Sequence, residues 1–443
     1  MVEYLEGNQL IHPSHHGFRA KHSTVSALVQ MFDSWIEAFE DDEVSAVIML
    51  DMSAAFDVVD HNILLSKLAL YGFEDDAILW IKSYLANRSQ SVFIEGCLSD
   101  PLTLDCGVPQ GSILGPLLYI LYTNDLPEAV HDHPPHQEHL REHPDNKYFN
   151  IQCHSCGGLC LYADDSTFTL SNKNVEELNE DIDAKYKVIA QYMNKNKLIL
   201  NSDKTHLLVM TSTRKHATYQ NFGMDLNTGT ETIQPQCEER LLGATISNNL
   251  SWNRHIRDSK TSLISSLTSR INALSKVCMY SNFMTRKMVA NGIVMSYLTY
   301  LIPLYGGCPE YLLTALQILQ NRAARYVTKS SWSTASSVML SQVGWLNVRQ
   351  MVVFHSLMLI FKAKQEKKPV YLHGMISATF NVNTRLAVNN GIRDTRRFKS
   401  GLGKQSFIPR SISQWNSLPW NIRFISNMVQ FKIKLKTWVK TNF

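Results

Sequence analysis

The sequence lacks the features that mark several common classes of protein. Its most apolar stretch, residues 293–305, is too short to cross a bilayer and is interrupted by Ser296, Thr299 and Pro303, so we expect no membrane span. The eight cysteines form no evenly spaced framework and no secretory signal opens the chain, which favours a reducing compartment, the nucleus or the cytoplasm. No ATPase-type phosphate loop, serine triad or tandem zinc finger is present, so nothing supports a helicase, a protease or another hydrolase.

Charge is scarce overall but unevenly spread. The 443 residues are 44% hydrophobic, which predicts a folded protein of two or three domains, and the net charge is only +4. Residues 381–443 hold twelve Lys or Arg and one acid, a charge of +11, which leaves 4 − 11 = −7 for the rest. Because three tryptophans are interleaved with these cations, we expect contact with a nucleic-acid backbone, the alternative being a lysine-rich end that faces solvent.

Three carboxylates stand out from this background. Residues 159–170, LCLYADDSTFTL, have the pattern of two strands joined by an acidic turn that holds Asp164 and Asp165. Residues 44–51 form a β-branched apolar run that ends on Asp51. Taken alone, two adjacent aspartates are most simply a solvated turn. A strand that delivers one carboxylate beside a hairpin that delivers two can instead hold paired divalent metals for phosphoryl transfer.

The order of these and other blocks resembles a known family. LDMSAAFD at 50–57, GVPQGSILGP at 107–116 and YADD at 162–165 are similar to polymerase motifs A, B and C of the reverse transcriptases of LINE-type (non-LTR, jockey-like) retrotransposons. HGFR at 16–19, with Ser23 and Thr24, resembles the fingers motif, although His15 stands where the family usually has glutamine. Residues 200–205 and 241–243 resemble motifs D and E, so the likeness extends over residues 8–256.

The resemblance implies a metal site. Asp51 and Asp164 would bridge two Mg²⁺ ions, which Mn²⁺ can replace, during nucleotidyl transfer to a primer 3′-hydroxyl. Asp165 belongs to the same motif, but its side chain should leave the strand on the opposite face, so it would support the other two. Lys204 would give a proton or a positive charge to the departing pyrophosphate; a solvated lysine is the alternative.

The resemblance also implies a substrate site. Phe56 would lie beneath the sugar and exclude a 2′-hydroxyl, Gln110 and Gly111 would lie beside the template and nucleotide bases, and Arg19 and Tyr162 would contact substrate. The partners are then an RNA template, a DNA primer and deoxynucleoside triphosphates.

The predicted fold is α+β, a right-hand polymerase. Residues 1–250 would form truncated fingers and a palm built on an antiparallel sheet packed by helices, residues 251–330 a helical thumb-like region, and residues 331–443 a basic C-terminal region of unknown role. Residues 126–158, rich in His and Cys, are expected to be an insertion. Within it the spacing of Cys153 and Cys156 suits Zn²⁺, although a solvated loop is the simpler interpretation.

The helices expected in this fold cover residues 23–39, 60–71, 75–86, 113–121, 174–194, 254–274, 284–302 and 312–328.

Two rival functions follow from the same pattern. The chain resembles the family without its upstream endonuclease domain and without the start of the fingers. It could therefore be a catalytically silent remnant, a folded nucleic-acid-binding palm and thumb that no longer polymerises. As an enzyme lacking part of the fingers, it is expected to bind a primer–template hybrid in a salt-dependent way but to extend it slowly. An RNA-dependent RNA polymerase fits less well, since it would be expected to carry Gly-Asp-Asp and no bulky Phe56.

Overall fold

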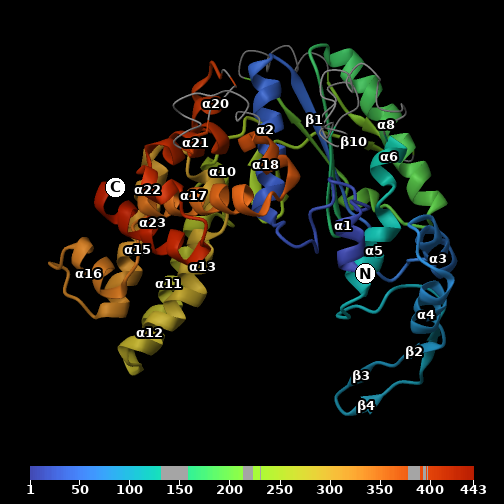
Figure 1. The fold of residues 1–443 in the computed structure, drawn as a ribbon, viewed down its shortest axis with the longest axis horizontal. Coiled ribbons are helices and arrows are strands. Elements are labelled where there is room, and N and C mark those ends of the chain that lie inside the picture. The colour runs from blue at the N-terminus through green and yellow to red at the C-terminus, as the bar shows by residue number, and fades with distance from the viewer. Residues whose placement is uncertain (131–157, 213–222, 230, 378–389, 393–395, 397) are drawn as a thin grey trace. The chain divides into compact units, whose positions relative to one another are not determined.

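The chain forms two compact units. The computed structural model describes residues 1–130, 158–212, 223–229, 231–377, 390–392, 396 and 398–443. The first unit comprises residues 1–27 and 42–237, and the second comprises residues 28–41 and 238–443 (Figure 1). The sequence had placed the end of the palm at residue 250 and had divided the rest at residue 330. The candidate zinc ligands Cys153 and Cys156 lie outside the described residues.

A four-stranded antiparallel sheet forms the centre of the first unit. Its order is β6 (Gly158–Tyr162), β7 (Asp165–Asn172), β1 (Val44–Leu50) and β8 (His206–Met210). Every residue of β1 is buried, which explains why this strand reads as a continuous apolar run. The predicted strands within 44–51 and 159–170 are therefore confirmed. Residues 198–200 form no strand, and Leu200 makes only an isolated bridge with Met52.

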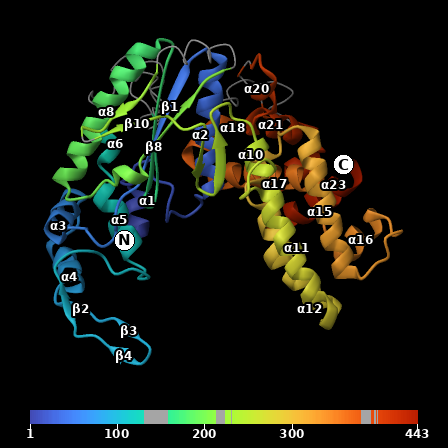
Figure 2. The ribbon, with the colours of Figure 1, turned by 180° about the vertical axis from the view of Figure 1, so that it is seen from behind.

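Helices surround this sheet. They are α1 (Val2–Gly7), α3 (His61–Leu70), α4 (Asp75–Leu85), α5 (Gly115–Thr123), α6 (Leu126–Val130) and α8 (Val175–Lys195). The side chain of Asp60 caps α3 by accepting from two backbone N–H groups, at 2.9 and 3.0 Å, and Gly72 follows the helix with φ +78°. Pro116 lies in the first turn of α5, where proline costs no hydrogen bond. Figure 2 shows α8 running beside the strands.

Short strands complete the first unit. The pairs β2 (Arg88–Gln90) with β5 (Leu102–Leu104) and β3 (Phe93–Ile94) with β4 (Cys97–Leu98) form a hairpin around Gly96. The 3-10 turn η1 (Ser202–Lys204) precedes β8, and β9 (Leu226–Asn227) pairs with β10 (Thr232–Ile233).

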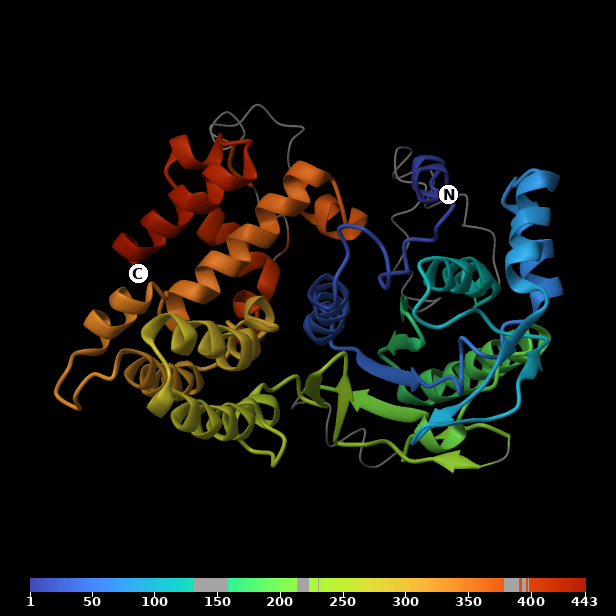
Figure 3. The same ribbon diagram turned by 90° about the horizontal axis from the view of Figure 1, so that it is seen from below.

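In the residues that the structure describes, the second unit has one pair of strands, β11 (Glu238–Leu241) and β12 (Ala244–Ser247), and many helices. Its helices are most of α2 (Thr24–Glu40), then α10 (Asn253–Ile256), α11 (Leu263–Tyr280), α12 (Phe283–Ala290), α13 (Ser296–Thr299), α14 (Ile302–Tyr305), α15 (Glu310–Thr328), α16 (Ser336–Val343), α17 (Val348–Glu366), α18 (Val370–Ser377), α20 (Gly401–Gln405), α21 (Phe407–Ser417), α22 (Trp420–Arg423) and α23 (Met428–Asn442). Figure 3 shows the long orange helix α17 beside the red C-terminal helices. Their contact includes the stacked rings of Phe361 and Phe431, with centroids 3.9 Å apart.

Two of the helices predicted for the thumb-like region are shorter in the structure than the sequence indicated. The helix expected at 254–274 is broken after Ile256, and α11 begins only where the side chain of Ser262 caps it by accepting from Ser265 N. The helix expected at 284–302 contains the π-turn Asn291–Met295 and stops before Leu301, whose φ of +57° does not continue a helix. Among the described residues, no single helix is long and apolar enough to cross a membrane, while the bent pair α16 and α17 passes that test by length and composition together.

Candidate active site

Strand register brings the three acidic residues to one end of the sheet. Leu50, the last residue of β1, pairs with Ser166 of β7, so Asp51 and Asp165 are the next residues along these neighbouring strands. Tyr162 pairs with Asp165 across the β6–β7 hairpin, which leaves Ala163 and Asp164 as a two-residue turn. The expected acidic hairpin is confirmed, with Asp164 in the turn and Asp165 opening β7.

The carboxylates of this site influence one another electrostatically. Burial, followed by the charges of Asp164 and Asp51, raises the pKa of Asp165. Asp164 also contributes, after burial, to the raised pKa of Tyr119. The three aspartates thus form one negatively charged group, which costs free energy unless a cation compensates it.

Lys204 supplies a cation at this place. Its Nζ lies 3.3 Å from Oδ2 of Asp51, and the lysine side chain is 65% exposed. An ion pair this open to solvent contributes little to stability. Breaking the ion pair between Lys204 and Asp51 therefore requires little free energy.

Backbone hydrogen bonds hold Asp51 and Lys204 on adjoining segments. Asn201 N donates to the carbonyl of Asp51 at 3.0 Å, and Ser53 N donates to the carbonyl of Ile199 at 2.9 Å. Since Lys204 follows this segment in η1, the blocks that resemble motifs A and D are fixed to each other beside the acids.

The segment that resembles the fingers motif supports the acidic turn. His16 N donates to Leu161 O at 2.8 Å, and Leu161 N donates to Ser14 O at 2.9 Å. A Cβ built on Gly17 would lie 2.4 Å from the backbone nitrogen of Ala163, so only glycine permits this approach. The close approach of Gly17 to the acidic turn was not expected from the sequence. Its position in the HGFR block was the one feature that could have indicated it.

Phe56 lies in an aromatic group. Its ring stacks on Tyr119, with centroids 4.6 Å apart, and meets the ring of Phe18 edge-on at 6.1 Å. The carbonyl of Phe56 accepts from Val108 N at 2.8 Å, which ties the block resembling motif A to the block resembling motif B. Phe56 is half-buried and packs against the core of the first unit.

Gln110 is bound within the protein. Its Nε2 donates to both carboxylate oxygens of Asp57, at 2.9 and 3.0 Å. Gly111 has φ +77° and no atom within 4 Å of a Cβ built on it, so it lies in open space. Asp57, Gln110 and Arg88 are among the residues that line a cavity of about 890 Å³. The sequence analysis missed Asp57, although it is the last residue of LDMSAAFD.

Arg19 and Tyr162 differ in their surroundings. The guanidinium of Arg19 donates to both carboxylate oxygens of Glu6, at 3.0 and 3.2 Å, and to the carbonyls of His12 and His15, each at 3.1 Å. Its side chain is only 8% exposed, and its hydrogen bonds hold the segments around Glu6 and His12 together. Tyr162 is half-buried at the end of β6, beside the acidic turn.

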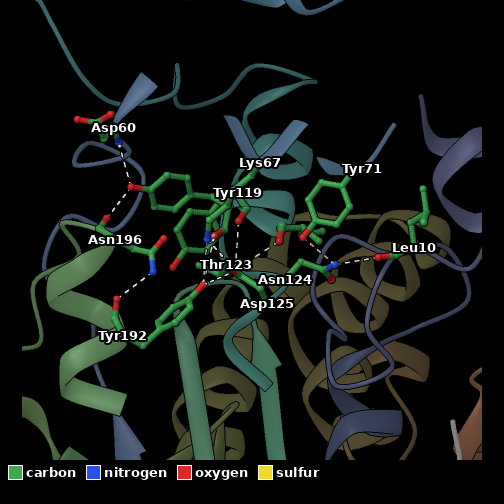
Figure 4. Close-up of polar contacts among 12 residues, drawn as sticks. Leu10, Asp60, Lys67, Tyr71, Tyr119, Thr123, Asn124, Asp125, Tyr192 and Asn196 are labelled. Carbon is green, nitrogen blue, oxygen red and sulfur yellow. Dashed lines mark hydrogen bonds and ion pairs between the residues drawn. The ribbon is translucent and has the colours of Figure 1, made fainter. Parts of the chain in front are cut away.

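A largely buried polar network joins α5 and the residues that follow it to α3 and α8 (Figure 4). Lys67 Nζ donates to Tyr122 O at 2.6 Å, to Asp125 Oδ1 at 2.7 Å and to Tyr192 OH at 3.2 Å. Burial lowers the pKa of Lys67, and Asp125 opposes that change. Asn124 extends the network by donating to Leu10 O at 2.8 Å. These residues come from distant segments and share no local pattern, so sequence reasoning could not group them.

The site has carboxylate oxygens of the kind that bind divalent metal ions, but these are not arranged as a complete set of ligands. Within the described residues, no group of three or more His, Cys, Asp or Glu side chains is arranged to hold a metal ion. The donor atoms at the end of the sheet are all carboxylate oxygens, the type that Mg²⁺ prefers. The raised pKa of Asp165 and the ammonium group beside Asp51 both indicate surplus negative charge that a cation would relieve. The residues therefore fit a divalent ion.

Comparisons with known proteins show which family the chain belongs to. A family model described as "Reverse transcriptase (RNA-dependent DNA polymerase)" matches residues 1–246. The chain is 26% identical over 347 residues to the probable RNA-directed DNA polymerase from transposon BS of Drosophila melanogaster, covering 78% of this chain and 36% of that protein. It is 27% identical over 322 residues to the RNA-directed DNA polymerase from mobile element jockey of the same species, covering 71% and 32%.

Because the matching model covers more than half of the chain, the chain belongs to the reverse transcriptase family, and the named relatives support its LINE-type, non-LTR branch. The expected α+β polymerase fold is confirmed. The chain spans about a third of the length of these curated relatives.

Solved structures with a likeness to the chain include two telomerases. Telomerase from Candida albicans, in complex with a fragment of telomeric RNA, has a TM-score of 0.41 at 12% identity, covering 84% of this chain and 56% of that one. Apo telomerase from Candida tropicalis has a TM-score of 0.39 at 11% identity, covering 84% and 59%.

Proposed function

We propose that this chain is the polymerase region of a non-LTR retrotransposon reverse transcriptase, which extends a DNA primer on an RNA template. The observation that carries the proposal is the convergence of Asp51, Asp164 and Asp165 at one end of the sheet, with Lys204 3.3 Å from Asp51. Divalent ions bound there, with Mg²⁺ favoured by the oxygen donors, would lower the pKa of the primer hydroxyl and neutralise charge on the pyrophosphate.

The chain's own residues then have separate tasks. Asp51 and Asp164 would hold the ions, and Asp165, whose pKa is raised, would add its charge once they are bound. Lys204, displaced from Asp51, would turn toward the leaving pyrophosphate, because its exposed ion pair is cheap to break. Gln110 would exchange its contact with Asp57 for the template or the incoming base beside the 890 Å³ cavity.

The proposal is tested by primer extension with Asp51→Asn and Asp164→Asn. Each change removes a metal-binding charge but no packing, so extension should fall about a thousandfold, equivalent to about 4 kcal/mol, while affinity for a primer–template hybrid stays close to wild type. Asp100→Asn, on the exposed hairpin, is the matched control and should extend normally. Near-normal extension by Asp51→Asn would exclude this assignment of the site.

Phe56 is the proposed selector of deoxynucleotides. Its ring is held by Tyr119 and Phe18, so its position is fixed rather than adaptable. Phe56→Ala should admit ribonucleotides and raise incorporation of GTP relative to dGTP on one template by about tenfold or more, since the ring would no longer occupy the space of the 2′-hydroxyl. An unchanged ratio would assign Phe56 to core packing alone.

One observation favours a second candidate, a nucleic-acid-binding remnant without polymerase activity. Lys204 neutralises Asp51, and the described residues offer no complete metal cluster. The extension assay separates the candidates, because a remnant would bind hybrid equally well with and without Asp51→Asn and would extend it in neither form.

A further inference from the structure

Three lysines line one face of the last helix of the chain. Lys432, Lys436 and Lys440 recur every four residues along α23, which places them on one side of the helix, and all three are exposed. The stripe next to the lysines, about 100° further round the helix, buries Phe431, Leu435 and Val439. These apolar residues hold the helix against the rest of the unit, and the adjacent stripe carries a row of ammonium groups.

Two lysines from other helices extend this row. Lys436 Nζ donates to Gly344 O at 3.3 Å, and a Cβ built on Gly344 would lie 3.9 Å from Lys287 Nζ, so α12 and α23 each bring a lysine to the end of α16. Burial, followed by Lys440, Lys287 and Lys432, lowers the pKa of Lys436. Lys362, exposed on α17, belongs to the same surface, because its charge and that of Lys432 both act on His355, whose pKa burial and these charges lower to about 4. We call these five residues the lysine row.

Acidic residues are almost absent around the lysine row. Helices α12, α16 and α23 contain no Asp or Glu, and α17 has only Glu366, its last residue. Within the described part of the chain, no ion pair joins any of the five lysines to a carboxylate. A surface that serves only solubility usually carries charges of both signs. A row of one sign, in which neighbouring lysines lower the pKa of Lys436 after burial, is therefore unfavourable unless an anion is bound.

We propose that the lysine row binds the phosphate backbone of a nucleic acid, independently of the catalytic carboxylates. Four residues of helix advance about 6 Å, so the three lysines of α23 cover about 12 Å, or about three to four phosphates of one strand at 3.4 Å each. Fixed point charges without base-reading amides or arginines suit a backbone contact that is indifferent to sequence. The row contains none of the residues assigned to the proposed reaction, so this partner surface is an addition to it.

The test removes the three lysines of α23 from the full chain. Lys432→Gln, Lys436→Gln and Lys440→Gln are combined, and the matched control combines Lys260→Gln, Lys276→Gln and Lys404→Gln, three exposed lysines of the same unit outside the row. Binding of a labelled DNA duplex and of a labelled RNA strand is measured by fluorescence anisotropy across a range of salt concentrations, and circular dichroism checks that each variant folds.

The expected result is a loss of slope in log K against log [salt] of about 2 to 3, because about 0.9 counterions per neutralised phosphate are released from a duplex and about 0.7 from a single strand. The control triple should lose less than half as much, and Asp51→Asn should keep the full slope whether or not it extends primers. Equal losses in the two triples would overturn the proposal, as would an unchanged slope together with weakened binding to vesicles of anionic lipid, which would assign the row to a membrane surface.

Discussion

His15 is a buried histidine beside the acidic turn, and it makes the fold sensitive to acid. Burial, then the charges of His12 and Arg19, lowers its pKa to about 3, and its neighbour His16 bonds to Leu161. In the unfolded chain the pKa of a histidine is about 6.5, so His15 takes up a proton there at a pH where it stays neutral in the folded chain. The free energy of unfolding therefore falls as the pH drops from about 6.5 toward 3. From pH 7 to pH 5 the loss from His15 alone should be about 2 kcal/mol.

His15→Gln is expected to remove this part of the acid sensitivity. Urea unfolding at pH 7 and pH 5 measures it, and the variant should lose about 2 kcal/mol less than wild type between the two. Some dependence will remain, because burial also lowers the pKa of His255 and His355 to about 4. An identical pH dependence in both proteins would show that the pKa of His15 is the same in the folded and the unfolded chain.

Local sequence patterns indicated which strand ends carry the three aspartates, but not the side-chain pairings between distant residues. Asp51 follows the continuous apolar run of β1, and Asp164 and Asp165 lie at the tip of a hairpin, so the strands could be recognised locally, and their pairing brings these ends together. The engagement of Arg19 with Glu6 and of Gln110 with Asp57 depends on side-chain pairing that no local pattern reports. In the unbound chain the polar groups of Arg19 and Gln110 are therefore engaged with Glu6 and Asp57, so each would have to leave these partners to contact substrate.

At the scale of elements, the acidic hairpin depends on its neighbour, the segment that carries Gly17. Gly17→Ala would drive a Cβ against the backbone of Ala163, at 2.4 Å, and would displace the turn that carries Asp164. A displacement of about 1 Å at a reacting centre can cost about a hundredfold in rate, so we expect primer extension to fall by that order. Gly7→Ala is the matched control, because no atom lies within 4 Å of a Cβ at that position. Normal extension by Gly17→Ala would show that the turn tolerates the shift.

Helix positions were predictable and helix breaks were not. Apolar periodicity indicated α3, α4, α8 and α15 in the right places, since each buries one stripe of side chains. Helix α5 was recognisable as an apolar run instead, because residues 118–123 are all buried. The interruptions at Ser262 and at Asn291–Met295 occur within patterns that continue the helical period, and capping and packing decide them. Tertiary contacts outweighed local preference at these two points.

At the scale of the whole molecule, the division into two units rests on contacts between residues far apart in the chain. Within the second unit, Arg396 lies 2.6 Å from Asp33 and 3.2 Å from Glu37 of α2, and Tyr371 donates to Asp33. The charge of +11 at residues 381–443 is therefore not all available to a partner: Arg396 is paired internally, and Arg410 donates to the carbonyl of Pro303. Composition alone could not separate such internal cations from the exposed lysines of α23.

The most direct test of the central claim is a count of bound metal at the three aspartates. Electron paramagnetic resonance can count Mn²⁺ on the full chain in complex with a primer–template hybrid and a non-hydrolysable deoxynucleotide. With the carboxylates as proposed ligands, the wild-type chain should bind about two ions per active site, as two-metal nucleotidyl transfer requires. Asp51→Asn with Asp164→Asn should bind none at the same concentration while still holding the hybrid. Equal binding of Mn²⁺ by the wild-type chain and the double variant would contradict the account.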